Sequence, residues 1–226
     1  MTRITYVLEE SAIEVIPREI RDDKMIRQFC LKRGKHPEEV LLDQSYHHKA
    51  ILKLANNEMR GRPDIIHFCL LEATSTPLYF KGQLDVYAHT LDDKIIKVEK
   101  NVRLPRVYER FVGLMEKLYV EKIISYKEKR LLTLSKGSFE DLLNKIRPST
   151  VIGLSSIGKE SSNEKVAKYA LRFENPVFIV GGFAKGHFGA DKRKLMDTLF
   201  SISRYSLNAH IVTARILYET EKIVLA

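Results

Sequence analysis

The chain has 226 residues, 44% of them hydrophobic, and a formal net charge of +9. We expect a single globular domain over residues 1–226, because this length buries a sizeable core and the composition excludes wholesale disorder. No apolar run reaches the ~20 residues of a membrane span, and the N-terminus lacks the apolar core of a signal peptide. The two cysteines form no disulfide framework. These three observations favour a cytoplasmic protein without a membrane partner.

The first half of the chain mixes strand and helix signals. Gly34 and Gly61 are typical of helix ends, Pro63 and Pro105 are typical of helix starts, and Ser45 is a candidate N-cap. In chain order we expect a strand at 3–10, a helix at 18–33, a strand at 40–43, helices at 45–60 and 63–73, a β-hairpin at about 84–99 with an Asp-Asp turn, and a helix at 106–120.

The last third alternates between the two types of element. We expect strands at 149–156 and 176–182, helices at 163–173, 190–200 and 208–222, and an extended segment at 201–207. This alternation predicts an α/β fold with a parallel sheet. Ligands of such sheets bind at the carboxyl ends of the strands, so three strand ends mark a candidate crevice.

A glycine-rich stretch, VGGFAKGHFGADK, follows the strand that ends near residue 180. Gly181 and Gly186 have the spacing of a phosphate loop, but His187 and Phe188 stand where that loop needs Lys and Ser or Thr. Glycines let backbone atoms approach a ligand closely. We therefore expect a ligand other than a triphosphate here, or only a turn.

Two arginine motifs are candidates for nucleic-acid recognition, which a basic chain also favours. In GRPDIIH, Asp64 either orients Arg62 toward a phosphate or base, or only caps the helix start. In RLPRVYERF, Arg106 and Arg110 are spaced i, i+4 on a predicted helix, and Arg103 precedes the turn. These arginines line one groove for RNA, or they belong to a solvated helix face.

The histidines give no signature of metal or nucleophilic chemistry. His47, His48, His67 and His187 have neither a zinc-finger nor an HExxH spacing. We expect no metal site and no Cys–His or Ser–His nucleophile.

Several of these segments together resemble one family. LLDQSYHHKA, GRPDIIHFCLLEA, the hairpin, RLPRVYERFVGLM, VFIVGGFAKG and SISRYSL occur in this order in the ribosomal small-subunit RNA pseudouridine N1-methyltransferases, across roughly residues 40–220. The chain is similar to the shorter, archaeal form. The resemblance implies a fold of the SPOUT type: a parallel sheet flanked by helices, a C-terminal trefoil knot, a β-hairpin insertion, and a homodimer.

The resemblance also implies the cofactor S-adenosyl-L-methionine and the residues of the site. Arg62, Arg103, Arg106 and Arg110 would bind the RNA. Arg62 and Asp64 would be the catalytic pair, in which Asp64 chiefly orients Arg62, because a carboxylate with an ordinary pKa is a poor base. The residues implied for cofactor binding are Leu154, Gly181, Gly186, Ile202, Ser203, Arg204, Tyr205, Ser206 and Leu207.

The activity that the resemblance implies is methyl transfer to N1 of a pseudouridine in small-subunit ribosomal RNA, with a role in ribosome biogenesis and ribosomal assembly proteins as further partners. One alternative is a non-catalytic rRNA-binding assembly factor. Another is a methyltransferase of the same fold that acts on a ribose or a uridine.

Overall fold

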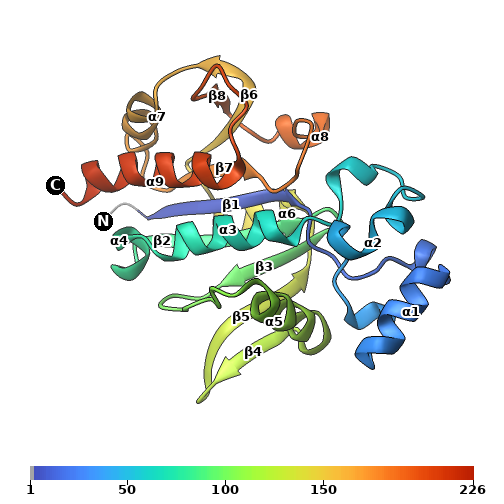
Figure 1. Cartoon of the computed structure of the whole chain (residues 1–226). Coiled ribbons are helices and arrows are strands. Elements are labelled where there is room, and N and C mark those ends of the chain that lie inside the picture. The colour runs from blue at the N-terminus through green and yellow to red at the C-terminus, as the bar shows by residue number, and fades with distance from the viewer. Residues whose placement is uncertain (1–2) are drawn as a thin grey trace.

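The computed structural model describes residues 3–226, which form one eight-stranded sheet with helices on both faces (Figure 1). The order of the strands across the sheet is β4-β5-β3-β2-β1-β7-β6-β8. The strands are β1 (Ile4–Ser11), β2 (Leu84–Thr90), β3 (Lys94–Val98), β4 (Ile123–Tyr126), β5 (Lys129–Lys136), β6 (Thr150–Glu160), β7 (Pro176–Gly181) and β8 (Thr198–Ser201).

The sheet has a parallel and an antiparallel part. Strands β2, β1, β7, β6 and β8 pair in parallel, whereas β3, β5 and β4 continue the sheet with antiparallel pairings. The predicted hairpin at 84–99 is present as β2 and β3. Its first strand, β2, pairs with β1, so the hairpin lies in the middle of the sheet. Its second strand, β3, pairs with β5, which places the β4–β5 hairpin at one edge.

Alternating side chains of β1 fill two cores on opposite faces of the sheet. Tyr6 and Leu8 lie on the face covered by α3, α5, α7 and α9, whereas Val7 faces Phe139 and Leu142 of α6 on the other side. The helices are α1 (Lys24–Arg33), α2 (Gln44–Ile51), α3 (Pro63–Thr74), α4 (Pro77–Phe80), α5 (Tyr108–Glu121), α6 (Phe139–Ile146), α7 (Asn163–Ala170), α8 (Ala190–Arg193) and α9 (Ala209–Val224).

The segment between β1 and α3 corrects two predictions. The helix expected at 18–33 starts only at Lys24, because Asp23 is extended and caps α1 by accepting the Met25 N–H at 2.8 Å. The strand expected at 40–43 makes a single bridge, between Val15 and Leu41, so residues 40–43 do not form a strand of the sheet.

The helix expected at 45–60 is also shorter than predicted. Its cap is Asp43 and not Ser45, because the Asp43 carboxylate accepts the Ser45 N–H at 2.7 Å. The helix α2 ends at Ile51, and Asn56 then adopts a left-handed conformation with φ 53° that the α-helix cannot contain.

The prediction of a helix at 190–200 is wrong in its second half. Helix α8 ends at Arg193, and residues 198–201 form β8, which pairs with Ile152–Leu154 of β6 at the sheet edge. The sequence reading also missed β4, β5 and α6. No helix within residues 3–226 is long and apolar enough to cross a membrane.

Candidate functional site

A hollow lies at the carboxyl ends of β7 and β8 and beside the middle of β6, where the pairing of β6 with β7 ends at Leu154. The alternation of strands and helices predicts a ligand crevice at this edge. Leu154 of β6, Gly181 of β7 and Ser201 of β8 each contribute to its wall, and Ala209 of α9 closes one side. The hollow is open to solvent on one side, and it encloses about 680 Å³ of empty space when its mouth is included.

The glycine stretch forms one wall of this hollow for steric reasons. A Cβ on Gly181 would lie 2.7 Å from the Phe183 ring, and a Cβ on Gly182 would lie 2.8 Å from the Ser11 Cα, so neither position has room for a side chain. Gly186 has φ +97°, a conformation that side chains disfavour. The glycines therefore bring bare backbone to the hollow.

The opposite wall is the loop between β8 and α9. The Ser201 hydroxyl donates to the Ser203 carbonyl at 2.8 Å, and the Ser203 hydroxyl accepts the Tyr205 N–H at 3.0 Å. These bonds order the loop, while Leu207 and Val212 supply apolar surface. Exposed backbone polar groups beside apolar walls suit a ligand that combines a flat heterocycle with hydroxyl and amino-acid groups, so the residues fit a nucleoside-type cofactor such as S-adenosylmethionine.

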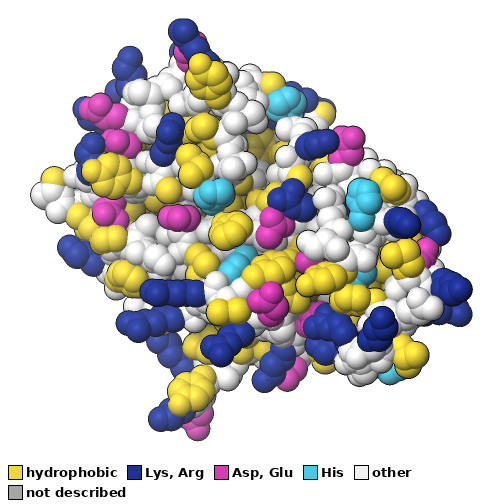
Figure 2. Space-filling model, in the orientation of Figure 1, with side chains coloured by type: hydrophobic (Ala, Val, Ile, Leu, Met, Phe, Trp, Pro, Cys, Tyr) yellow, Lys and Arg dark blue, Asp and Glu magenta, His cyan; other side chains and the backbone are white. Residues whose placement is uncertain are grey.

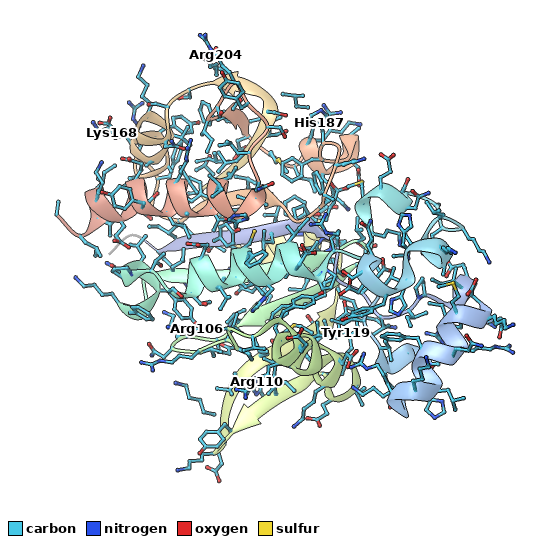
Figure 3. All side chains as sticks on the ribbon, viewed as in Figure 1. Arg106, Arg110, Tyr119, Lys168, His187 and Arg204 are labelled. Carbon is cyan, nitrogen blue, oxygen red and sulfur yellow. The ribbon has the colours of Figure 1, made fainter. Side chains whose placement is uncertain are left out.

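The structure brings together most of the predicted cofactor residues. Arg204 lies apart: it extends away from the body of the protein (Figure 3), 82% exposed, and pairs with Glu160 at 2.8 Å. Ser206 is likewise not part of the lining. The predicted residues that do line the hollow are Leu154, Gly181, Gly186, Ile202, Ser203, Tyr205 and Leu207.

Sequence reasoning missed several residues of this site. Ser155 and Ser156 line the hollow after Leu154; they are the last two residues of the strand predicted at 149–156, whose end was expected at the crevice, but they were not among the predicted cofactor residues. Phe183 and Phe188 lie inside the glycine stretch and supply aromatic surface to the hollow, and their place in that stretch was the available signal.

The Arg62–Asp64 pair has the geometry of a two-point fork. The Arg62 Nε donates to the Asp64 Oδ1 at 2.8 Å and its Nη2 donates to the Oδ2 at 2.7 Å. Both side chains are 34% exposed, and the hydrogen bond to Asp64 raises the pKa of Arg62. Asp64 therefore fixes the plane of the guanidinium and leaves its remaining edge open to a ligand.

Arg62 is tied to the glycine wall through the backbone. Its N–H donates to the Ala12 carbonyl at 2.9 Å, and the Ala12 N–H donates to the Gly182 carbonyl at 2.8 Å. The first arginine motif is thus two hydrogen bonds away from Gly182, which lies between the hollow-lining residues Gly181 and Phe183, through the chain that leaves β1.

The second arginine motif surrounds the start of α5. The helix begins at Tyr108, so Arg106 precedes it and the predicted shared helix face with Arg110 is wrong: Val107 is extended, with φ −80° and ψ 127°. Arg103, Arg106 and Arg110 are nevertheless all exposed, and Figure 3 shows Arg106 and Arg110 on the same part of the surface, below α3.

Buried contacts hold this second motif against α3. The His67 ring nitrogen Nε2 lies 2.7 Å from the Pro105 carbonyl, and the His67 ring stacks on Phe111 with 4.4 Å between ring centres. Tyr108 donates a hydrogen bond to the Asp43 carboxylate, and burial together with this bond raises the pKa of Tyr108. Asp43 and Tyr108 thus join α2 to α5 beside the arginines, a pairing that sequence reasoning did not find.

The described residues contain no group of three or more His, Cys, Asp or Glu side chains that could hold a metal ion. Cys30 and Cys69 are buried, and burial raises the pKa of Cys69 to about 12, so its thiolate is scarce at neutral pH.

The fold and the hollow define an α/β protein with a candidate ligand site at its strand ends and arginines beside it. The family model described as EMG1/NEP1 methyltransferase matches residues 6–221, and the chain belongs to this family. The chain is 37% identical to the ribosomal RNA small subunit methyltransferase Nep1 of Pyrococcus furiosus, over 98% of both proteins. It is also 37% identical to the Nep1 of Staphylothermus marinus, over 97% of this chain and 96% of that protein.

A solved relative confirms the predicted α/β sheet flanked by helices. The crystal structure of Archaeoglobus fulgidus Nep1 bound to S-adenosylhomocysteine superposes with a TM-score of 0.89 at 33% identity, and each chain is covered completely. The trefoil knot stays a prediction.

Proposed function

We propose that this protein is an S-adenosylmethionine-dependent methyltransferase that acts on small-subunit ribosomal RNA and takes part in ribosome biogenesis. The observation that carries the proposal is the backbone link from Arg62 through Ala12 to Gly182, which couples the arginine surface to the wall of the hollow. The names of the relatives, and the S-adenosylhomocysteine held by the Archaeoglobus fulgidus protein, support the same conclusion.

The hollow has the groups that this cofactor needs. When bound, S-adenosylmethionine supplies an activated methyl group. The bare backbone at Gly181 and Gly186 and the ordered loop at Ser203 would hold the amino-acid and ribose parts, and Leu154 and Leu207 would pack against the adenine.

We propose N1 of a pseudouridine as the atom that receives the methyl group. The target base has to leave its stack to reach a crevice, so a loop or single strand is the expected substrate. Arg103, Arg106 and Arg110 would bind the flanking phosphates, and Arg62, held in plane by Asp64, would position the nucleotide. Because both Asp64 oxygens already accept from Arg62, we assign Asp64 orientation rather than proton transfer.

We also propose that the protein acts as a homodimer in the cytoplasm, with ribosomal assembly proteins as further partners. Helix α9 buries Ile216 and Leu217 in the core but exposes Tyr218 by 58%, and Phe68 of α3 is 50% exposed beside His210. Figure 2 shows hydrophobic side chains among the polar ones on this face, which suits a second copy of the chain. Light scattering of the wild type and of a Phe68→Glu variant tests this: a dimer that the variant turns into a monomer is expected, and a monomeric wild type would contradict it.

Labelled methyl transfer tests the function. We expect the purified protein to label isolated small-subunit rRNA and to leave large-subunit rRNA unlabelled. We expect Arg106→Ala to weaken RNA binding and its salt dependence while cofactor affinity stays the same. Tight binding without any transfer would favour the non-catalytic assembly factor, and unchanged RNA affinity of Arg106→Ala would remove that residue from the site.

A further inference from the structure

A second basic groove lies outside the site described above. It is formed by β3, the turn that follows β3, and the start of β5. Five cationic side chains and two acidic ones line it, a surplus of three positive charges. The cations are Arg3, Lys97, Lys100, Lys129 and Arg130, and the acids are Asp85 and Glu99.

The cations of this groove differ in their partners. Arg3 pairs with Asp85, and Lys97 pairs with Glu99 at 2.6 Å, so these two charges are compensated locally. Lys129 and Arg130 are exposed and make no ion pair or side-chain hydrogen bond with any residue in 3–226. Two uncompensated cations at neighbouring positions give the groove donors that are free to bind a polyanion.

The β4–β5 hairpin presents these two cations at its tip. Tyr126 pairs opposite Lys129, is 65% exposed, and has the Lys127 ammonium 5.6 Å from its ring centre. Lys127 and Glu128 form the turn, and both are left-handed, with φ 46° and φ 64°. Basic side chains mixed with an exposed aromatic ring are typical of nucleic-acid surfaces.

A short stretch of chain joins the groove to the second arginine motif. Lys100 lines the groove and Arg103 follows three residues later, so their Cα atoms are separated by at most about 11 Å of extended chain. Asp85 and Lys97 point to the same side of the sheet as Tyr87 and Ile95, which is the side of α6, whereas α5 covers the opposite side. An RNA that contacts both surfaces therefore passes around the chain between Lys100 and Arg103.

We propose that this groove binds the phosphate backbone of the RNA stem that closes the target loop, through Lys129 and Arg130. This inference rests on the proposed function and names the part of the substrate that the groove recognises. Stem recognition needs no base contacts, because side chains read double-stranded RNA through its shape and its phosphates. The groove would thus add affinity and fix the direction in which the loop enters the site.

RNA affinity measured with stems of two lengths tests the proposal. One hairpin carries the target loop on a stem of a few base pairs, and the other extends that stem by about one helical turn. We expect the double variant Lys129→Ala, Arg130→Ala to bind the short hairpin like the wild type and to bind the long hairpin more weakly. Because each lost phosphate contact lowers the salt slope by about 0.9, the affinity ratio of wild type to variant should grow about tenfold between 200 mM and 50 mM salt.

The matched control removes the same two charges elsewhere. Lys165 and Arg172 are exposed and make no ion pair within the described part of the chain, so Lys165→Ala, Arg172→Ala should leave both affinities unchanged. Two outcomes overturn the stem proposal. One is an equal loss of affinity for both hairpins, which nonspecific attraction or a binding site for a protein partner would give. The other is an unchanged affinity for the long hairpin.

Arg106→Ala should weaken the binding of both hairpins alike. Because the readout is binding, a failure of methyl transfer would count against the proposed function and leave this test intact.

Discussion

Asp64→Asn separates two roles that the Arg62–Asp64 pair allows. The substitution keeps the size of the side chain and removes one of the two charge-assisted bonds, which measure 2.8 and 2.7 Å. Both side chains are 34% exposed, so the solvent screens the pair and the free energy of unfolding should fall by less than about 1 kcal/mol. The loss of orientation of Arg62 should weaken RNA binding about tenfold, or about 1.4 kcal/mol.

One effect opposes this loss. Removing the carboxylate also removes a negative charge beside the RNA, which favours binding, and physiological salt screens that gain beyond about 8 Å. A double-mutant cycle isolates the coupling: if Asp64 acts through Arg62, then Asp64→Asn should cost almost nothing in the Arg62→Ala background. The measurements are RNA affinity and turnover at saturating RNA. Unchanged affinity with turnover lowered by about 100-fold or more would identify Asp64 as a general base and refute the orienting role.

Three further predictions concern other parts of the chain. Burial lowers the pKa of His47 to about 4, whereas the unfolded value is near 6.5. The contribution of the neutral ring to the free energy of unfolding is therefore fully present above pH 6.5 and is lost as the pH falls toward 4. His47→Asn should remove up to about 3 kcal/mol of this pH dependence, as measured by urea titrations. Gly182→Ala should place a methyl group 2.8 Å from the Ser11 Cα and weaken cofactor binding, measured by calorimetry. An unchanged affinity would show that the backbone around Ser11 moves to accommodate the methyl group. Lys127→Asn with Glu128→Gly should relieve about 1 kcal/mol or more of left-handed strain and slow amide exchange in β4 and β5, and faster exchange would contradict this.

Local signals predicted the elements that local chemistry decides. Pro63 starts α3 at its first position, as predicted. The hairpin at 84–99 was also found, because β-branched residues flank a turn. Each of these elements carries its own start or stop signal within a few residues.

Partners distant in sequence decide the elements that were missed. Residues 198–200 continue a helical pattern, but pairing with β6 makes them a strand. Asp43 outcompetes Ser45 as the cap of α2, and the same carboxylate accepts from Tyr108, 65 residues away. Competition of this kind is not visible in a single sequence.

The candidate site was predicted in part by position and in part by resemblance. The three strand ends pointed to the segments 153–156, 180–186 and 202–207, and the resemblance supplied the individual cofactor residues within them. Neither source gave Phe183 or Val212, which reach the hollow through the folding of the glycine stretch and the packing of α9. The link from Arg62 to Gly182 likewise depends on Ala12, a residue with no chemistry of its own.

Methyl incorporation into two RNA hairpins of identical sequence, one with uridine and one with pseudouridine at the target position, separates the proposed reaction from its alternatives. We expect transfer from S-adenosylmethionine to the pseudouridine hairpin alone, with the methyl group on N1 of the product nucleoside. Transfer to the uridine hairpin, or to a ribose, would contradict the proposed acceptor. Tight binding of both hairpins without transfer to either would contradict the proposed catalysis and leave an RNA-binding assembly factor.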